Sequence, residues 1–232
     1  MKLALMQPYF LPYVGYWQLL AAVDEFIVYD NIKYTKKGWI NRNRMLRNGE
    51  DVMFSLPLQG ASDSLDIVER ELSDSFDREK LLSQFSGAYR RAPCFAQTFP
   101  LVERIVRCEE RNLFRYLHHS LVQMCQHLGI RTKITISSTI PIDPMLTNQD
   151  MVLAYCLAAG AKTYVNAIGG VELYSKEVFR ERGLELCFIK SKPFEYPQFG
   201  QPFVPWLSIL DLMMFNPLEV LQNCIFTNYE LS

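Results

Sequence analysis

Apolar and polar positions alternate along the chain in a pattern that predicts strands and helices in turn. Short apolar or β-branched runs, typical of buried strands, occur at 2–6, 25–30, 131–136, 162–166 and 184–189. Apolar positions at helical spacing fill several of the intervals between these runs, at 14–22, 148–159 and 171–181. This alternation predicts an α/β fold with a mainly parallel, Rossmann-like sheet flanked by helices.

The middle of the chain is helical instead. Amphipathic stretches cover 81–89, 100–106 and 113–128, and the last of them ends at Gly129. We expect the segment of about 70–128 to be a helical insertion packed on the sheet. A chain of 232 residues can bury one large core. Residues 1–232 are therefore predicted to form a single α/β domain.

Other segments break the simple alternation. Residues 31–47 are polar, basic and without a clear period, so this long connection is interpreted as a functional loop. Further strands are predicted at 51–57 and 66–69. The Pro-rich, aromatic tail is predicted to contain short helices at 207–214 and from Pro217 onward.

Composition narrows the class of protein. Lys and Arg number 24 and Asp and Glu 25, and the resulting charge of −1 argues against a general nucleic-acid binder. The N-terminus lacks the pattern of a secretory signal, and no run approaches the roughly 18 apolar residues of a membrane span. The six cysteines are scattered and include no CxxC pair. This pattern indicates reduced thiols rather than a disulfide framework. These features predict a cytoplasmic protein with no membrane span.

The first candidate site is the loop from Gln7 to Gln18, which joins the first strand to a helix. Doubly wound folds bind ligands at this position, and Gly15 would let an anion approach the helix N-terminus. The candidates here are Gln7, Tyr13 and Gly15. Class I nucleotidylyltransferases place an HxGH-type motif at the same turn, and this loop has the glycine but neither histidine. The alternative is a rigid turn that packs on the core.

The second candidate site is the basic stretch from Asp30 to Arg47, which contains six cations and two aromatic residues. The candidates are Lys33, Trp39, Asn41, Arg42 and Arg44. Arginine forks bind phosphates, an indole stacks on a base or a sugar, and asparagine amides suit sugar hydroxyls. The stretch therefore predicts a phosphorylated ligand, and the alternative is a solvated basic loop.

Polar residues also follow later predicted elements. Asn166 ends a strand before Gly169 and Gly170, which would form a second wall of the same crevice or a turn required by geometry alone. The tail supplies the candidates Tyr196, Gln198, Ser208 and Asp211. Ser208 and Asp211 are three residues apart on an apolar helix, so they face a pocket or form a capping box.

No metal site is predicted. His118, His119 and His127 lie on or near the long helix with no matching carboxylate or cysteine spacing. The aromatic residues, in contrast, cluster at 9–17, 34–39 and 194–206, each beside proline, glycine or basic residues. This distribution predicts that they line a ligand crevice.

Several segments of the sequence resemble those of a known protein family. The chain resembles the WbqC-like family of bacteria through QPYFLPYVGY (7–16), WINRNR (39–44), YVNAIGG (164–170) and FVPWLSILDLMMFN (203–216). The resemblance implies a role in O-antigen, lipopolysaccharide or other surface-polysaccharide biosynthesis, and a glycine (aminoacyl) transferase activity on an amino sugar. It carries no established catalytic residues onto this sequence.

The leading hypothesis is a transferase that acylates the amine of a nucleotide-linked amino sugar. Arg42 and Arg44, with Lys33 or Lys37, would hold the phosphates, and Trp39 or a tyrosine would stack. Asp30 or Asp211 would act as the base, and Asn166, Gln7 or Ser208 would supply polar contacts. The donor would be an activated amino acid or acyl group, with an acyl carrier or an aminoacyl-tRNA as the candidates for its carrier.

Three alternatives remain open at the level of sequence. One is an ATP-dependent enzyme that activates an amino acid, with ATP in the crevice. Another is a non-catalytic module that binds a glycan or a partner enzyme. The third is RNA binding through residues 33–47, which the net charge disfavours.

Overall fold

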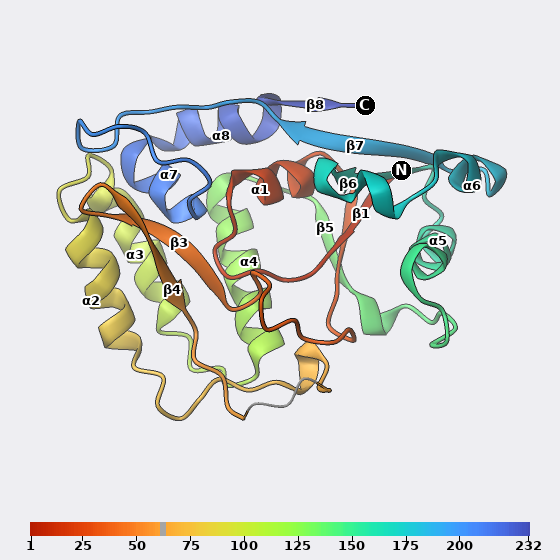
Figure 1. Ribbon diagram of the computed structural model, residues 1–232, viewed down its shortest axis with the longest axis horizontal. Helices are drawn as coiled ribbons and strands as arrows, with labels where there is room; N and C mark the ends of the chain where they lie inside the picture. Colours follow the sequence, from red (N-terminus) through yellow and green to blue (C-terminus); the bar gives the residue numbers. More distant parts are fainter. Residues whose placement is uncertain (61–63) are drawn as a thin grey trace.

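A six-stranded sheet forms the centre of the protein in a computed structural model that describes residues 1–60 and 64–232 (Figure 1). Its strands lie in the order β5-β2-β1-β6-β7-β8. They are β5 Lys133–Ile136, β2 Glu25–Val28, β1 Lys2–Met6, β6 Thr163–Ala167, β7 Glu185–Ser191 and β8 Tyr229–Leu231. All neighbours are parallel except β8, which pairs antiparallel with β7. The predicted α/β class with a mainly parallel sheet is confirmed.

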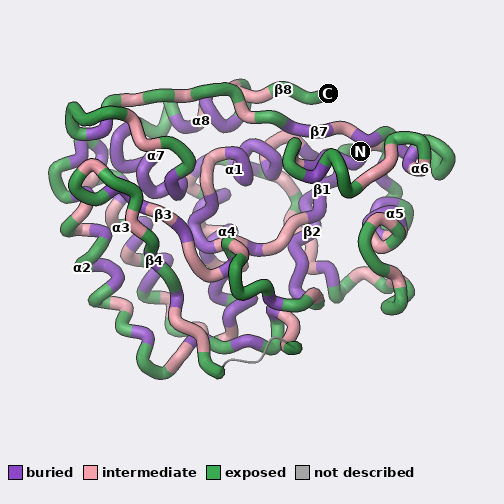
Figure 2. Tube along the Cα trace, in the orientation of Figure 1, coloured by how far each residue is buried: buried purple, intermediate pink, exposed green. Residues whose placement is uncertain are grey.

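The central strands are apolar throughout because both faces of the sheet are covered. In β1, Leu3 and Leu5 face one core cluster, while Ala4 between them faces the other, as the two-residue period of a strand requires. Figure 2 shows β1 and β2 buried over most of their length. Burial on both sides explains why these strands are continuous apolar runs in the sequence.

Helices cover the two faces of the sheet. One face packs against α5 Asn148–Ala158 and α6 Lys176–Glu181. The other packs against α1 Val14–Ala21, α4 Leu113–Leu128 and α8 Leu218–Thr227. The short helix α7 Ile209–Phe215 joins this second, larger core, and its residues are all buried. No helix in the described part of the chain is long and apolar enough to cross a membrane.

The predicted helical insertion lies beside the larger core (Figure 1). It follows a separate two-stranded sheet of β3 Arg42–Arg47 and β4 Glu50–Ser55 and the 3-10 turn η1 Ile67–Glu69. Its helices are α2 Arg78–Tyr89, α3 Phe95–Val106 and α4. Phe54 of β4 meets Phe85 of α2 edge to face, with ring centroids 4.9 Å apart. The insertion therefore shares one continuous core with α1, α7 and α8.

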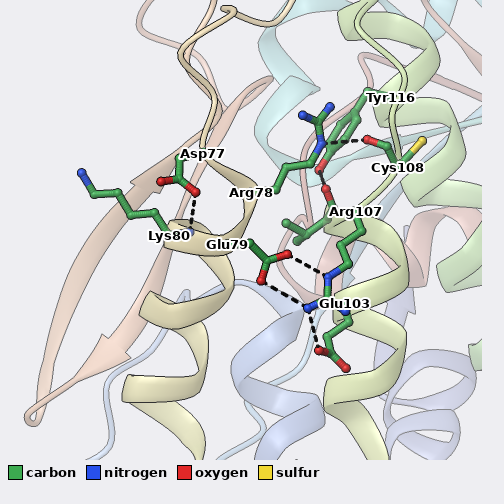
Figure 3. Close-up of polar contacts among 9 residues, drawn as sticks. Asp77, Arg78, Glu79, Lys80, Glu103, Arg107, Cys108 and Tyr116 are labelled. Carbon is green, nitrogen blue, oxygen red and sulfur yellow. Dashed lines mark hydrogen bonds and ion pairs between the residues drawn. The ribbon is translucent and has the colours of Figure 1, made fainter.

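Surface polar contacts occur within and between α2 and α3 (Figure 3). Asp77 caps α2 by accepting a 2.9 Å hydrogen bond from the Lys80 amide. Arg107, at the end of α3, bonds to Glu79 at 2.9 Å and to Glu103 at 3.3 Å. Exposed ion pairs of this kind contribute little stability, so the packing of α2 on α3 depends on the apolar residues that both helices bury in the larger core.

The basic stretch contains a strand that the sequence analysis did not predict. The interpretation of 31–47 as irregular is wrong for its second half, because β3 pairs with β4 in a hairpin. Alternation along β3 buries Asn43 and Met45 and leaves the arginines more exposed. The turn is Asn48–Gly49, with φ of 54° and 84°. Asn-Gly with two positive φ values is the pattern of a two-residue hairpin turn, and this pair was the missed signal.

Four other predictions need correction. The predicted strand 66–69 is a 3-10 turn, because Asp66 and Glu69 form a capping box. The predicted helix 171–181 is divided into η3 Ile168–Leu173 and α6, because the Ser175 side chain caps a new helix. Gly169 and Gly170 thus lie in a 3-10 helix rather than in a simple turn. Thr147, which the sequence predicts as the N-cap of the helix at 148–159, makes no side-chain cap bond to α5.

The start of one helix and the presence of one strand also differ from the prediction. Helix α3 begins at Phe95 rather than at Pro100, because the Gln97 and Thr98 amides already bond to the Cys94 carbonyl. Pro100 therefore lies inside the helix, where it lacks the N–H that would bond to the Ala96 carbonyl. The edge strand β8 was not predicted, since three half-exposed residues give no period to detect.

Candidate functional site

A cavity of about 230 Å³ lies where three distant segments meet. We call it the aromatic pocket, and its lining residues are Tyr9, Pro12, Tyr13, Trp39, Asn43, Arg44 and Trp206. They come from the loop after β1, from the start of the β3 hairpin, and from the segment before α7. Each segment contains one of the three aromatic clusters of the sequence. The predicted aromatic lining of a crevice is therefore present as a cavity.

One wall of the pocket comes from a loop that starts at the sheet edge where folds of this class bind ligands. Counted within the main sheet, the strand order is 3-2-1-4-5-6, so the order reverses between β1 and β6. Ligands of open α/β sheets bind beyond the carboxyl ends of the strands at such a switch point. Tyr9 and Tyr13 lie on the loop that leaves the carboxyl end of β1.

Two buried side chains hold the loop after β1 in place. Asn43 Nδ2 donates to the carbonyls of Phe10 at 3.3 Å and Leu11 at 2.9 Å. Ser208 Oγ donates to the same Leu11 carbonyl at 2.6 Å, and the Ile209 amide donates to Pro12 at 3.0 Å. Leu11 has a φ of 45°, a strained value for a non-glycine residue. The hairpin and α7 together therefore hold the loop in a conformation that it would not adopt alone.

Gly15 makes room for the ring of Tyr13. A Cβ atom at position 15 would lie 2.5 Å from Cε2 of the Tyr13 ring. The ring packs over the start of α1 and lies 6.1 Å, centroid to centroid, from the ring of Trp206. Burial raises the pKa of Tyr13 and Tyr9 above 10, with Tyr13 adding to the effect on Tyr9, so both phenols are neutral hydrogen-bond donors at pH 7.

Two arginines lie close to the ring of Trp39. The guanidinium carbons of Arg42 and Arg44 are 5.7 Å and 5.6 Å from its ring centroid, within the range of cation–π interaction. Arg42 donates hydrogen bonds to its own loop, from Nε to the Gly38 carbonyl at 2.9 Å and from Nη2 to the Lys37 carbonyl at 2.6 Å. It therefore supports the loop rather than presenting a free fork.

Arg44 is the cation that faces the pocket. Its Nη1 pairs with Asp51 at 3.0 Å and its Nη2 donates to the Trp206 carbonyl at 3.2 Å. Its Nε is buried and has no hydrogen-bond partner among the described residues. The pair with Asp51 is partly exposed and thus weak. An anionic ligand can compete for this guanidinium at low cost.

A second polar group lies at the carboxyl ends of β2 and β5. Asp30 Oδ1 accepts from Ser137 Oγ at 2.8 Å and from the Ser138 amide at 2.9 Å, and Oδ2 accepts from Ser138 Oγ at 2.6 Å. Only 4% of Asp30 is exposed. Lys33 is exposed, and its backbone forms a single antiparallel β-bridge with the backbone of Asp66. No residue of this group lines the aromatic pocket.

The end of β6 carries the predicted second wall. The Asn166 amide lies over Gly170, where a Cβ would be 2.5 Å from Nδ2, and its Oδ1 accepts from the Ala167 amide at 2.9 Å. Gly169 is exposed and has nothing near its Cβ position. Gln7 is half-buried, and its Oε1 accepts a long, 3.5 Å bond from Tyr9. Of these residues only Gln7 touches a residue of the aromatic pocket.

Asp211 is fully buried and cannot meet a ligand directly. It accepts from Tyr89 at 2.9 Å, Tyr196 at 2.6 Å and Gln198 at 2.7 Å. The predicted capping box with Ser208 is therefore wrong for Asp211, while Ser208 does cap α7 through the Leu210 amide. Burial raises the pKa of Asp211, and the bonds from Tyr196, Gln198 and Tyr89 oppose that rise.

The remaining predicted residues have structural partners. Asn41 accepts from Tyr34 and donates to the Leu56 carbonyl, both at 2.7 Å. Tyr196 and Ser208 line a second cavity next to the aromatic pocket.

No group of three or more His, Cys, Asp or Glu side chains in the described ranges could hold a metal ion.

Comparison with known proteins shows the family. The model of the WbqC-like protein family matches residues 7–223. The chain belongs to the WbqC-like protein family. It is similar to "Uncharacterized protein Rv1507c" of Mycobacterium tuberculosis (strain ATCC 25618 / H37Rv), with 29% identity over 215 residues that cover 91% of this chain and 92% of the relative. No solved structure gives a significant match.

In this WbqC-like protein the aromatic pocket unites some predicted residues and adds others. Tyr13, Trp39 and Arg44 were predicted from the sequence and meet in the pocket. Asn43, which with Asn41 was expected to suit sugar hydroxyls, and Trp206, which ends the third aromatic cluster, also lie in the pocket and in strings that carry the family resemblance. Their signal was local, a polar residue inside WINRNR and an indole inside a Pro-aromatic segment, but nothing in the sequence shows that these segments meet.

Gly15→Ala tests the packing of the Tyr13 ring. We expect the new methyl group to displace the ring and to lower the free energy of unfolding by about 1–3 kcal/mol, the usual cost of overpacking. Urea denaturation measures this change. The matched control is Gly87→Ala inside α2, where nothing lies within 4 Å of the added atom and a helical alanine stabilises by about 0.5–1 kcal/mol. Equal stabilisation of both variants would contradict the Tyr13 packing.

Proposed function

We propose that this WbqC-like protein is a cytoplasmic transferase of surface-polysaccharide (O-antigen) biosynthesis that places glycine or another acyl group on the amine of a nucleotide-linked amino sugar. The observation that carries the proposal is the aromatic pocket, in which Trp39, Tyr13 and Trp206 converge with Arg44 beside the loop that leaves the switch-point strand β1.

The pocket suits a ligand with a flat face and a negative charge. Trp39 is 40% exposed and Trp206 66% exposed, so both indoles can stack on a base or on the apolar face of a sugar ring. Arg44 adds a guanidinium whose exposed pair with Asp51 a phosphate can replace. Neutral Tyr9 and Tyr13 add donors for sugar hydroxyl or phosphate oxygens.

The proposed chemistry needs an activated donor, a base and an oxyanion partner. The sugar amine nitrogen attacks the carbonyl carbon of a thioester or ester, and the tetrahedral oxyanion collapses to an amide. The C–S or C–O bond breaks, and the leaving thiol or alcohol takes the proton that the amine releases. The base relays that proton, and backbone or side-chain donors stabilise the oxyanion.

Asp30 is the proposed base and Asp211 a positioning residue. Asp30 lies at the carboxyl end of β2, outside the aromatic pocket, so the amine of a bound sugar would extend beyond the pocket to reach it. Its Oδ2 accepts a single hydrogen bond among the described residues, which leaves acceptor capacity for an amine. Asp211 is enclosed by Tyr89, Tyr196 and Gln198. We propose that it acts through Tyr196 and Gln198 by fixing the segment that carries Trp206.

Mass spectrometry of reaction mixtures tests the proposed activity. Purified protein is incubated with UDP-glucosamine and with glycyl-tRNA, glycyl thioesters or short acyl thioesters as donors. The expected product is an amide of the sugar amine. Asp30→Asn should lower the rate by at least about 100-fold, whereas Asp24→Asn, at the opposite end of β2, should not. Absence of an amide with every donor would overturn the proposal.

A second candidate is ATP-dependent activation of an amino acid. The switch point between β1 and β6 favours it, because mononucleotides bind at this place in doubly wound sheets. It requires amino-acid-dependent exchange of pyrophosphate into ATP. Exchange without acylation of UDP-glucosamine would favour this candidate over the transferase.

A further inference from the structure

A second cavity of about 560 Å³ adjoins the aromatic pocket. We call it the tail pocket, because its walls are the segments 190–196 and 203–209 and helix α7, closed by Tyr13 and Val14 at the start of α1. These segments run from β7 back to α7 (Figure 1). The volume lies within the range of about 300–1,000 Å³ found for small-molecule sites.

The walls of the tail pocket present hydrocarbon to a ligand. Its polar wall groups direct their hydrogens into the protein: Ser191 Oγ donates to Gln18 at 2.5 Å, Ser208 Oγ to Leu11 at 2.6 Å and Tyr196 Oη to Asp211 at 2.6 Å. The remaining surface includes the side chains of Phe194, Phe203 and Leu212. A polar ligand body would lose its hydration here without compensation, so the ligand body must be apolar.

The charged wall residues favour an anionic group on that ligand. Lys190, Lys192 and Glu195 line the cavity, and Glu230 lies opposite Lys190 on the neighbouring strand β8. Lys192 pairs with Glu230 at 3.5 Å, but both side chains are exposed, so this pair is weak and easily exchanged. Lys190 has no ion pair within the described residues. A carboxylate or phosphate placed near both lysines would give Lys190 an ionic partner and would replace Glu230 at Lys192.

We propose that the tail pocket binds a single-chain amphiphile, with its hydrocarbon chain along Phe194, Phe203 and Leu212 and its carboxylate or phosphate at Lys190 and Lys192. This site goes beyond the proposed function, which concerns the aromatic pocket. Tyr13 and Trp206 line both cavities, so the two ligands would lie on opposite sides of one pair of rings. An enzyme with two substrates needs such adjacent sites.

Isothermal titration calorimetry on the full chain tests the ligand class with four ten-carbon probes. Decanoate and decyl phosphate carry the predicted negative charge, decanol is neutral and decyltrimethylammonium is positive. We expect the two anions to bind at least ten times more tightly than the cation. The ratio between decanoate and decyl phosphate shows whether the head group is a carboxylate or a phosphate.

Two variants locate the binding to the tail pocket. Val204→Glu puts a charge into the apolar wall and should weaken decanoate binding at least tenfold, since Val204 is held through its backbone bonds to Gln198. The control Val68→Glu changes an exposed valine on η1 that is also held through its backbone. The double variant Lys190→Gln, Lys192→Gln should weaken the anions about five- to tenfold and leave decanol unchanged.

The possible results distinguish failure of the amphiphile proposal from failure of the proposed function. Equal binding of decanoate and decyltrimethylammonium, no binding of any probe at millimolar concentration, or decanoate binding unaffected by Val204→Glu and by the lysine double variant would each overturn the proposal. If Val204→Glu does not fold, the exposed lysine pair carries the test alone. Binding of UDP-glucosamine, measured separately, reports on the aromatic pocket. Loss of the sugar activity with retained decanoate binding would therefore reject only the proposed function.

Discussion

Asp211→Ala is expected to lower the free energy of unfolding by about 3–5 kcal/mol, the cost of removing one partner from a buried charged network. The carboxylate is fully buried and accepts three hydrogen bonds. Its loss leaves the donors of Tyr89 and Gln198 buried without an acceptor. Tyr89 also accepts the Leu46 amide at 2.8 Å, so the network connects β3, α2, α7 and the segment before Trp206.

Urea denaturation of matched variants measures this effect. Asp51→Ala removes a partly exposed carboxylate from its pair with Arg44, and it should cost less than about 1 kcal/mol. Asp211→Asn keeps one acceptor oxygen but turns an amide group toward the donor of Gln198, so its effect should lie between the two. Similar unfolding curves for Asp211→Ala and the wild type would show that the network does not support the fold.

The pH dependence of stability gives a second readout of Asp211. Because burial raises its pKa in the folded state, the folded protein holds this proton more tightly than the unfolded chain, whose Asp pKa is about 3.9. Its contribution to stability is thus largest below that value and decreases as pH rises through the folded pKa. Asp211→Asn should remove this component.

Trp39→Ala is expected to weaken the binding of UDP-glucosamine by about 10- to 100-fold, since a stacked ring contributes about 1–3 kcal/mol and 1.4 kcal/mol is tenfold in affinity. The reason is that Trp39 supplies an exposed ring face with two guanidinium groups beside it. Stability should change little, because the side chain is 40% exposed. Calorimetric titration of the folded variant measures the effect.

Phe226→Ala is the matched control for this experiment. Phe226 has the same 40% exposure but lies on α8 and outside the residues that line the aromatic pocket. Trp39→Phe should restore part of the affinity, because it retains a ring face. Binding of UDP-glucosamine by Trp39→Ala at wild-type affinity would show that the ligand does not stack in this pocket.

The sheet could be predicted because its signal is local and strong. Strands β1 and β2 are buried on both faces, so Leu3, Ala4 and their neighbours form apolar runs. The hairpin of β3 was harder to see, because Arg42 and Arg44 stay partly exposed while Asn43 is buried as a polar residue. A period carried by buried asparagine does not appear in a hydrophobic pattern.

Asp211 shows why a local pattern can mislead about a site. Three residues after Ser208, it fits a capping box in the sequence, and Ser208 does cap α7. The carboxylate instead bonds to Tyr89, which is 122 residues away along the chain, and to Tyr196 and Gln198. A buried acceptor must bond to the donors that packing brings near it, and packing depends on the whole chain.

By itself the sequence determined the alternation of strands and helices, the residue types available for a site, and the family resemblance. It did so because hydrophobic period and turn chemistry depend on neighbours a few residues apart. Only the tertiary structure decided that Tyr13, Trp39 and Trp206 form one pocket and that Asp30 and Asn166 lie outside it. The bond from Ser208 to Leu11 joins residues 197 apart, and contacts at that separation follow from how the layers pack around the sheet.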